Sequence, residues 1–160
     1  MNNELFNKAL PFVLNQEGGF VNDPDDKGGA TNKGVTQGTY DAYRKAHKQP
    51  IQTVKNITDT EVSDIYYNNY WLKAGCDKMT PIFAVISFDT AVNMGIGRVQ
   101  EFMHAAEYTS IDKFLLARIG KYVEFAQNKT QAKFLLGWLN RVFRLIDFVK
   151  TIKIRVEENV

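Results

Sequence analysis

The fold is decided early in the chain, where an apolar helix runs into an acidic, glycine-rich loop: ELFNKALPFVLNQEGGFVNDPDDKGGATNKGVT, residues 4–36. Phe6, Leu10, Val13 and Glu17 follow one another at spacings of four, three and four residues. This period predicts a helix that carries all four side chains on one face. The glycine pair at residues 18–19 predicts that the helix ends directly after Glu17.

The next segment, residues 20–36, is dominated by Asn, Asp, Pro and Gly and predicts a structured loop. At most a small β-hairpin is expected within it, near residues 28–36. Loops of this length are uncommon in a small domain and are usually functional.

Helix signals recur through the rest of the chain. Residues 58–61 form a capping box, and Thr80-Pro81 places a proline at a favourable first helical position. Periodic apolar residues predict helices near residues 40–47, 58–71, 80–93, 110–127 and 130–150. The sequence therefore predicts a mainly α fold, and 160 residues suit a single hydrophobic core.

Charge and cysteine content argue against nucleic-acid binding, disulfide formation and cysteine-based catalysis. The net charge of +2 does not point to nucleic acid, although residues 111–160 hold ten Lys and Arg against five Asp and Glu. That basic third could face an anionic polymer or could be a solvated helix surface. Cys76 is the only cysteine, so no intrachain disulfide can form. We expect a buried thiol rather than a nucleophile served by His47 or His104.

Glu17 has the setting of a general acid. Its position on an apolar face and at a helix C-terminus should raise its pKa, because both disfavour a negative charge. Asp23, Asp25 and Asp26, in an exposed loop, should leave at least one carboxylate ionised. Two carboxyl groups in contrasting environments are what glycoside hydrolysis requires. An ordinary acidic turn explains the same residues equally well.

Two other loop types fail. An EF-hand beginning at Asp23 would have Lys27 at its fifth position and Gly34 at its twelfth, where a bidentate Glu is required. A phosphate-binding loop fails because Gly34 is followed by Val35-Thr36 rather than by Lys and Ser or Thr. No metal and no cofactor are predicted.

A resemblance to a known family favours the glycosidase interpretation of this loop over an ordinary acidic turn. The loop motifs Glu17-Gly-Gly-Phe, Asp23-Pro, Asp26 with Gly28-Gly29, Thr31 and Gly34-Val-Thr36 resemble the signature of glycoside hydrolase family 108, N-acetylmuramidases of phages and bacteria. Further similar motifs are Tyr70-Trp71, Asp89-Thr-Ala-Val-Asn93-Met-Gly95, and Gly137-Trp138 followed by Arg141. The resemblance spans about residues 3–145.

The resemblance implies roles for the catalytic residues. Glu17 is the catalytic acid, and Asp26, or alternatively Asp23, stabilises positive charge or activates water. Thr31 positions the water, although it lies one residue nearer to Asp26 than in the commonest phage endolysin pattern, so Thr36 stays an alternative.

It also implies substrate contacts and architecture. Tyr70 and Trp71, with Tyr66, form a wall for sugar rings unless these aromatic rings belong to the core, and Asn93 binds an acetamido group unless it only ends a helix. The expected fold is a lysozyme-like helical bundle. Residues 1–80 are its catalytic part and residues 81–160 a peptidoglycan-binding-like part, packed as one compact domain.

The implied activity is bacteriolysis by cleavage of the β-1,4 bond between N-acetylmuramic acid and N-acetylglucosamine. The partner is peptidoglycan, with no nucleic acid and no integral membrane segment expected, and the protein is a monomer. No signal peptide is apparent, so the protein is expected to be made in the cytoplasm and released to the wall or periplasm through a holin-like pore. The alternatives are a non-catalytic peptidoglycan-binding or secretion-accessory module and a DNA-binding protein.

Overall fold

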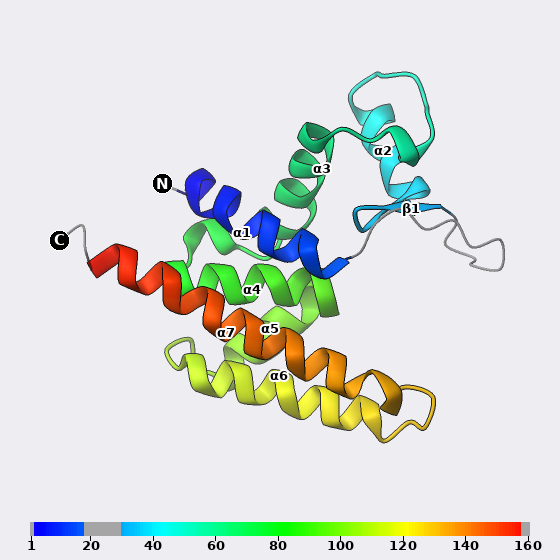
Figure 1. The fold of residues 1–160 in the computed structure, drawn as a ribbon. Helices are drawn as coiled ribbons and strands as arrows, with labels where there is room; N and C mark the ends of the chain where they lie inside the picture. The colour runs from blue at the N-terminus through cyan, green and yellow to red at the C-terminus, as the bar shows by residue number, and fades with distance from the viewer. Residues whose placement is uncertain (1, 18–29, 158–160) are drawn as a thin grey trace. The chain divides into compact units, whose positions relative to one another are not determined.

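The computed structural model describes residues 2–17 and 30–157, with side chains for residues 4–16 and 30–152 (Figure 1). The chain divides into two compact units, the first of residues 3–69 and the second from Tyr70 onward. Each unit is described by itself. Among the described residues, no helix is both long and apolar enough to cross a membrane.

The first unit combines helices with one small hairpin. Its elements are α1 (Asn2–Glu17), β1 (Thr31–Asn32), β2 (Val35–Thr36), α2 (Gln37–Ala46), the 3-10 turn η1 (Val54–Asn56) and α3 (Asp59–Tyr66). The predicted face of α1 is confirmed, because Phe6, Leu10 and Val13 are buried. The edge of Phe6 meets the ring of Tyr67, with centroids 5.0 Å apart. The predicted stop at residues 18–19 lies outside the described residues.

The hairpin is confirmed and has a tight two-residue turn. β1 and β2 are antiparallel, with Thr31 opposite Thr36 and Asn32 opposite Val35. Lys33 and Gly34, between the strands, both have positive φ, 51° and 74°. Two positive φ angles define the turn whose twist matches that of a hairpin. Thr31 and Thr36 are thereby brought onto neighbouring strands.

The second unit is built of helices around α4. The π-helical η2 (Tyr67–Leu72) belongs to the first unit up to Asn69 and to the second from Tyr70. The further elements of the second unit are η3 (Cys76–Lys78), α4 (Pro81–Met94), α5 (Ile96–Ala105), α6 (Ile111–Ala126), η4 (Ala132–Phe134) and α7 (Leu135–Glu157). Residues 83–91 of α4 are all buried. A helix that is buried on every side is the centre of its unit. α6 and α7 lie side by side (Figure 1).

Two elements of the second unit differ from the sequence prediction. α5 was not predicted, because Gly95 and Gly97 suggested a break. In the structure Gly95, with φ 88°, serves both as the C-cap of α4 and as the N-cap of α5. The last helix begins at Leu135 rather than near residue 130, and it extends to Glu157, beyond residue 150, where the predicted helix ended.

A buried ionic cluster joins three helices of the second unit. Asp89 of α4 is fully buried and pairs with Arg118 of α6, Nη1 to Oδ2 2.7 Å, and with Arg141 of α7, Nη2 to Oδ1 2.9 Å. The Arg141 Nε also donates to Asp89 Oδ1 at 3.0 Å. Because a buried carboxylate is stable only when it is paired, Asp89 fixes α6 and α7 on α4.

We expect Asp89→Asn to destabilise the protein by about 3–5 kcal/mol, because it leaves two buried guanidinium groups without their counter-ion. Chemical unfolding monitored by circular dichroism measures the loss. Asp147→Asn, at an exposed ion pair on α7, is the control and should change stability by less than about 1 kcal/mol. Equal stability of the two variants would contradict the central role of Asp89.

Candidate active site

Of the predicted acid and its partner carboxylates, the structure describes only the backbone of the acid. Glu17 is the last residue of α1, and its backbone is described but its side chain is not. Asp23 and Asp26 lie outside the described residues. Their roles therefore stay predictions.

The hairpin separates the two candidate threonines by their hydrogen bonds. The Thr36 Oγ1 is engaged as the N-cap of α2, since it accepts from the Thr39 N–H at 3.3 Å and lies 3.0 Å from the Thr39 hydroxyl. The hydroxyl of Thr31, opposite it, has no partner among the described residues. Of the two hydroxyls, only that of Thr36 is therefore engaged within the described part of the chain.

Hydrogen bonds to neighbouring segments hold the hairpin in place. The Asn32 Nδ2 donates to the carbonyls of Val54 and Lys55, both at 3.2 Å. The Tyr66 hydroxyl donates to the Lys33 carbonyl at 3.0 Å, and Lys33 pairs with Asp59. β1 is thus attached to η1, and the turn of the hairpin to α3.

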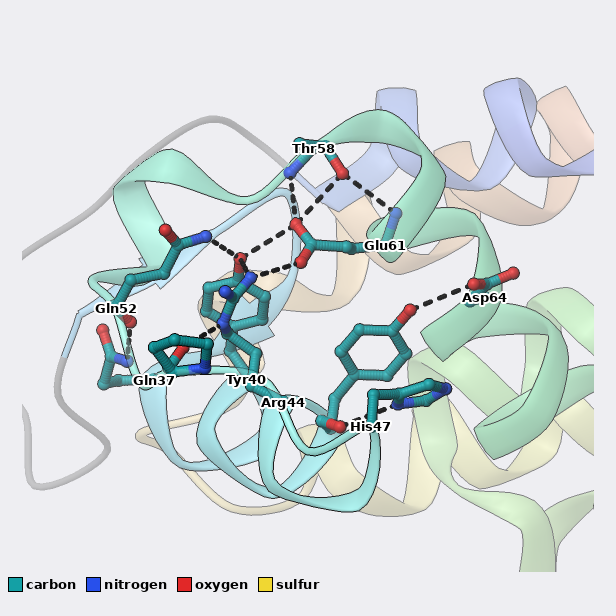
Figure 2. A network of polar contacts seen from close by, with 10 residues as sticks. Gln37, Tyr40, Arg44, His47, Gln52, Thr58, Glu61 and Asp64 are labelled. Atoms are coloured by element: carbon teal, nitrogen blue, oxygen red, sulfur yellow. Dashed lines mark hydrogen bonds and ion pairs between the residues drawn. The ribbon is translucent and has the colours of Figure 1, made fainter.

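A network centred on Glu61 fixes α2 against α3 (Figure 2). The Glu61 Oε2 accepts from the Tyr40 hydroxyl at 2.8 Å and from the Thr58 N–H at 2.9 Å, while Oε1 accepts from Arg44 Nη1 at 2.7 Å. Thr58 and Glu61 also complete the capping box that the sequence predicted. The Tyr40 hydroxyl accepts in turn from Arg44 at 3.1 Å and from Gln52.

This network determines the charge of Glu61. Burial alone would raise the pKa of Glu61, but the hydrogen bonds from Thr58 and Tyr40, together with the Arg44 cation, hold it below its usual value of 4.5. Glu61 is therefore ionised and structural. It is unsuited to the proton donor's role, although it is a buried carboxyl.

We expect Glu61→Gln to lower the free energy of unfolding by about 2–4 kcal/mol at neutral pH. Because the folded-state pKa is depressed, the contribution of Glu61 is present above its unfolded pKa and is lost as pH falls through the folded pKa. The difference between wild type and variant should therefore shrink on acidification below about pH 4.5. Urea unfolding at a series of pH values checks this, and a difference that is independent of pH would contradict it.

The three predicted substrate residues have different environments. Trp71 is fully buried, with its ring edge-on to Phe88 at 5.4 Å, and Tyr70 is half-buried. The Oδ1 of Asn93, also half-buried, accepts from the Tyr122 hydroxyl and, at 3.5 Å, from Arg118 Nη2. Their contact with a substrate stays a prediction, but the enclosed Trp71 ring offers no open face to a sugar.

Cys76 is buried, as predicted. Burial and, to a lesser extent, the nearby Asp77 carboxylate raise the pKa of the Cys76 thiol to about 12. A thiol without its thiolate form is a poor nucleophile, so it suits no cysteine-hydrolase mechanism. Within the described part of the chain, no group of three or more His, Cys, Asp and Glu side chains is placed to hold a metal ion.

We expect the Cys76 thiol of the folded protein to react with a thiol reagent at pH 8 at least about a hundredfold more slowly than that of the urea-unfolded chain. Absorbance of the released chromophore measures both rates. Similar rates would contradict the burial of Cys76.

Comparison with known proteins defines the class: the chain is a glycoside hydrolase. It belongs to glycosyl hydrolase family 108, whose sequence model matches residues 10–95. This confirms the resemblance read from the loop motifs. The matched span contains the candidate residues from Glu17 to Asn93.

A solved structure agrees over nearly the whole chain. SagA of Brucella abortus superposes with a TM-score of 0.68 at 26% sequence identity, covering 89% of this chain and 92% of that chain. The prediction of a mainly α, lysozyme-like fold with one small hairpin is confirmed. No curated protein matches the chain in sequence.

Proposed function

We propose that this protein is a peptidoglycan hydrolase, an N-acetylmuramidase that uses Glu17 as its general acid. The observation that carries the proposal is the family match across residues 10–95, which includes Glu17 at the end of α1. The buried face of α1 leads to this residue, because Val13 lies one helical turn before it. A carboxyl at the end of an apolar face is suited to keep its proton near neutral pH.

In the proposed reaction Glu17 protonates the glycosidic oxygen of the β-1,4 bond after N-acetylmuramic acid while an oxocarbenium-like centre develops. Asp26, or Asp23, stabilises that charge or activates water. Thr31 is proposed to position the water, because Thr36 is engaged as a helix cap and the Thr31 hydroxyl has no partner among residues 30–152, whose side chains the structure describes. The separation of the carboxyl groups, about 5 Å or roughly 6.5–9.5 Å, decides between retention and inversion.

Asn93 is suited to bind the acetamido group of the substrate. Because its Oδ1 is occupied by Tyr122 and Arg118, its Nδ2 is left to donate to a carbonyl oxygen. Tyr70 is proposed as a further sugar contact, with Trp71 as its support. We further propose residues 1–80 as the catalytic part and residues 81–160 as the part that binds the wall, in a monomer that reaches the wall through a holin-like pore.

We expect Glu17→Gln to lower the rate of peptidoglycan clearance by about 10²–10⁴-fold with little change in stability, because it removes the proton and keeps the shape. Turbidity of a wall suspension gives the rate. Mass analysis of the digest should show new reducing ends at N-acetylmuramic acid. Clearance at the wild-type rate by Glu17→Gln would refute the role of Glu17.

The two threonines should respond differently. We expect Thr31→Val to slow clearance by about 10- to 100-fold with an unchanged melting temperature, since it removes the hydroxyl proposed to position water and breaks no hydrogen bond among the described residues. Thr36→Val should cost about 1 kcal/mol of stability, the value of a helix cap, with a smaller effect on rate. The reverse pattern would assign the water-positioning role to Thr36.

The alternative function is a wall-binding module without catalysis, which the basic residues of the last third favour. Such a module would sediment with purified wall and release no reducing ends. Detection of new reducing ends excludes it.

A further inference from the structure

A groove of about 550 Å³ runs along the first unit between α2 and the α3–η2 segment. Neither the motifs nor the mechanism above uses it. Its lining is part apolar and part polar, with an aromatic side chain, an imidazole, a carboxylate and two amides among ten residues. Figure 2 shows two of these, His47 and Asp64, beside the Glu61 network.

One wall of the groove is a fixed pair of rings. The rings of Tyr43 and His47 have centroids 4.2 Å apart and planes inclined by 36°. The His47 Nδ1 lies 2.8 Å from the Tyr43 carbonyl, and the Tyr43 hydroxyl donates to Asp64 Oδ2 at 3.0 Å. Rings at this separation lie face to face, so the outer face of the pair is left for the apolar face of a pyranose ring.

The Tyr43 phenol keeps its proton at neutral pH. Burial and, after it, the hydrogen bond to the Asp64 carboxylate raise the pKa of Tyr43 to about 12. The bond to Asp64 therefore persists at neutral pH, and it leaves the Asp64 Oδ1 without a partner among the described residues.

Small residues leave room for a polymer along α2. Gly38, Ala42 and Ala46 all line the groove and follow one another at intervals of four residues, so they share one face of the helix. Ala42 and Ala46 are exposed. A chain of rings can lie along this face without displacing a side chain.

The groove begins at the hairpin. Thr39 lines it, and the Thr39 hydroxyl lies 3.0 Å from that of Thr36, which faces Thr31 across the sheet. A ligand in the groove would therefore lead directly to the strand pair that carries the proposed water-positioning residue.

The carboxylate of Asp64 favours a neutral sugar ring over an acidic one in this groove. Asp64 is the one carboxylate among the ten lining residues that the structure describes, and none of the ten is Lys or Arg. Its free oxygen can accept from a sugar hydroxyl but repels another carboxylate. The Asn68 Nδ2 is engaged by the Asp64 carbonyl at 2.8 Å, which leaves its Oδ1 to accept from an amide N–H.

We propose that this groove is a subsite for a neutral N-acetylglucosamine ring of the glycan strand, stacked on the outer face of the Tyr43–His47 ring pair, and that Asp64 disfavours the acidic N-acetylmuramic acid ring there. The proposal rests on the proposed function, because it takes the substrate to be peptidoglycan. It deepens that function by naming the ring, the groove and the specificity residue.

Binding can be measured without cleavage in the Glu17→Gln protein, with chitotetraose, a β-1,4-linked N-acetylglucosamine oligomer, as the probe. We expect Ala46→Trp, which fills the groove from an exposed position, to weaken binding by at least about tenfold. Ala105→Trp is the matched control, since Ala105 is also an exposed last residue of a helix and does not line the groove. It should bind as the parent does, and calorimetric titration compares the three proteins.

The role of Asp64 is tested by the ratio of two affinities. In the same background, Asp64→Asn should improve binding of a muramic-acid-containing disaccharide relative to chitobiose by roughly three- to tenfold. Tyr43→Phe, which keeps the ring and loses only its hydrogen bond to Asp64, should leave the ratio nearer to that of the parent. An unchanged ratio in Asp64→Asn would overturn the specificity assignment.

The outcomes separate this inference from the function on which it rests. Unchanged binding by Ala46→Trp, or no chitotetraose binding by the Glu17→Gln protein at millimolar concentration, overturns the groove even if Glu17→Gln has lost cleavage. Cleavage retained by Glu17→Gln refutes the catalytic assignment alone. If Ala46→Trp does not fold, His47→Ala, at another exposed position, replaces it with the same expected loss.

Discussion

A buried carboxylate must be paired, and each compact unit of this protein is organised around one. In the first unit Glu61 receives hydrogen bonds from Tyr40 and Thr58 and an ion pair from Arg44. In the second, Asp89 lies between Arg118 and Arg141. Neither carboxylate can be left without its partners except at a cost of several kcal/mol, so each enforces the packing of the helices that supply those partners.

The candidate site depends on the first of these arrangements. α2, capped by Thr36 of β2, supplies the small-residue face and the Tyr43 ring, whereas α3 supplies Asp64 and the Tyr66 hydroxyl that holds the hairpin. Because Glu61 of α3 is joined to Tyr40 and Arg44 of α2, the two walls of the groove and the hairpin are positioned together. The contacts that keep Glu61 ionised therefore also position the walls of the groove that we propose as a subsite.

Local patterns predicted much of this fold. The apolar period identified the buried face of α1, the capping box identified the start of α3, and Thr80-Pro81 identified the start of α4, because each signal is complete within one or two helical turns. The lone cysteine was rightly expected to be buried. The loop motif led to the family, because its residue types and spacings are specific to that family, whereas a mainly α fold is not.

Features that depend on distant residues were not predictable in this way. α5 is short, and the glycines at both sides of its first residue concealed it. Asp89 and Arg141 are separated by 52 residues, so their pairing follows only from packing. The sequence left Thr31 and Thr36 as alternatives, and the hairpin register with the α2 cap distinguishes their hydroxyls. The ring pair in the groove equally required the hydrogen bond between Tyr43 and Asp64, 21 residues apart.

The lone, buried Cys76 bears on how the fold responds to reducing and oxidising surroundings. With no second cysteine in the sequence to join it, Cys76 forms no intrachain disulfide. The described fold is held by packing, hydrogen bonds and ion pairs. A change in the thiol redox state of the surroundings leaves these interactions as they are.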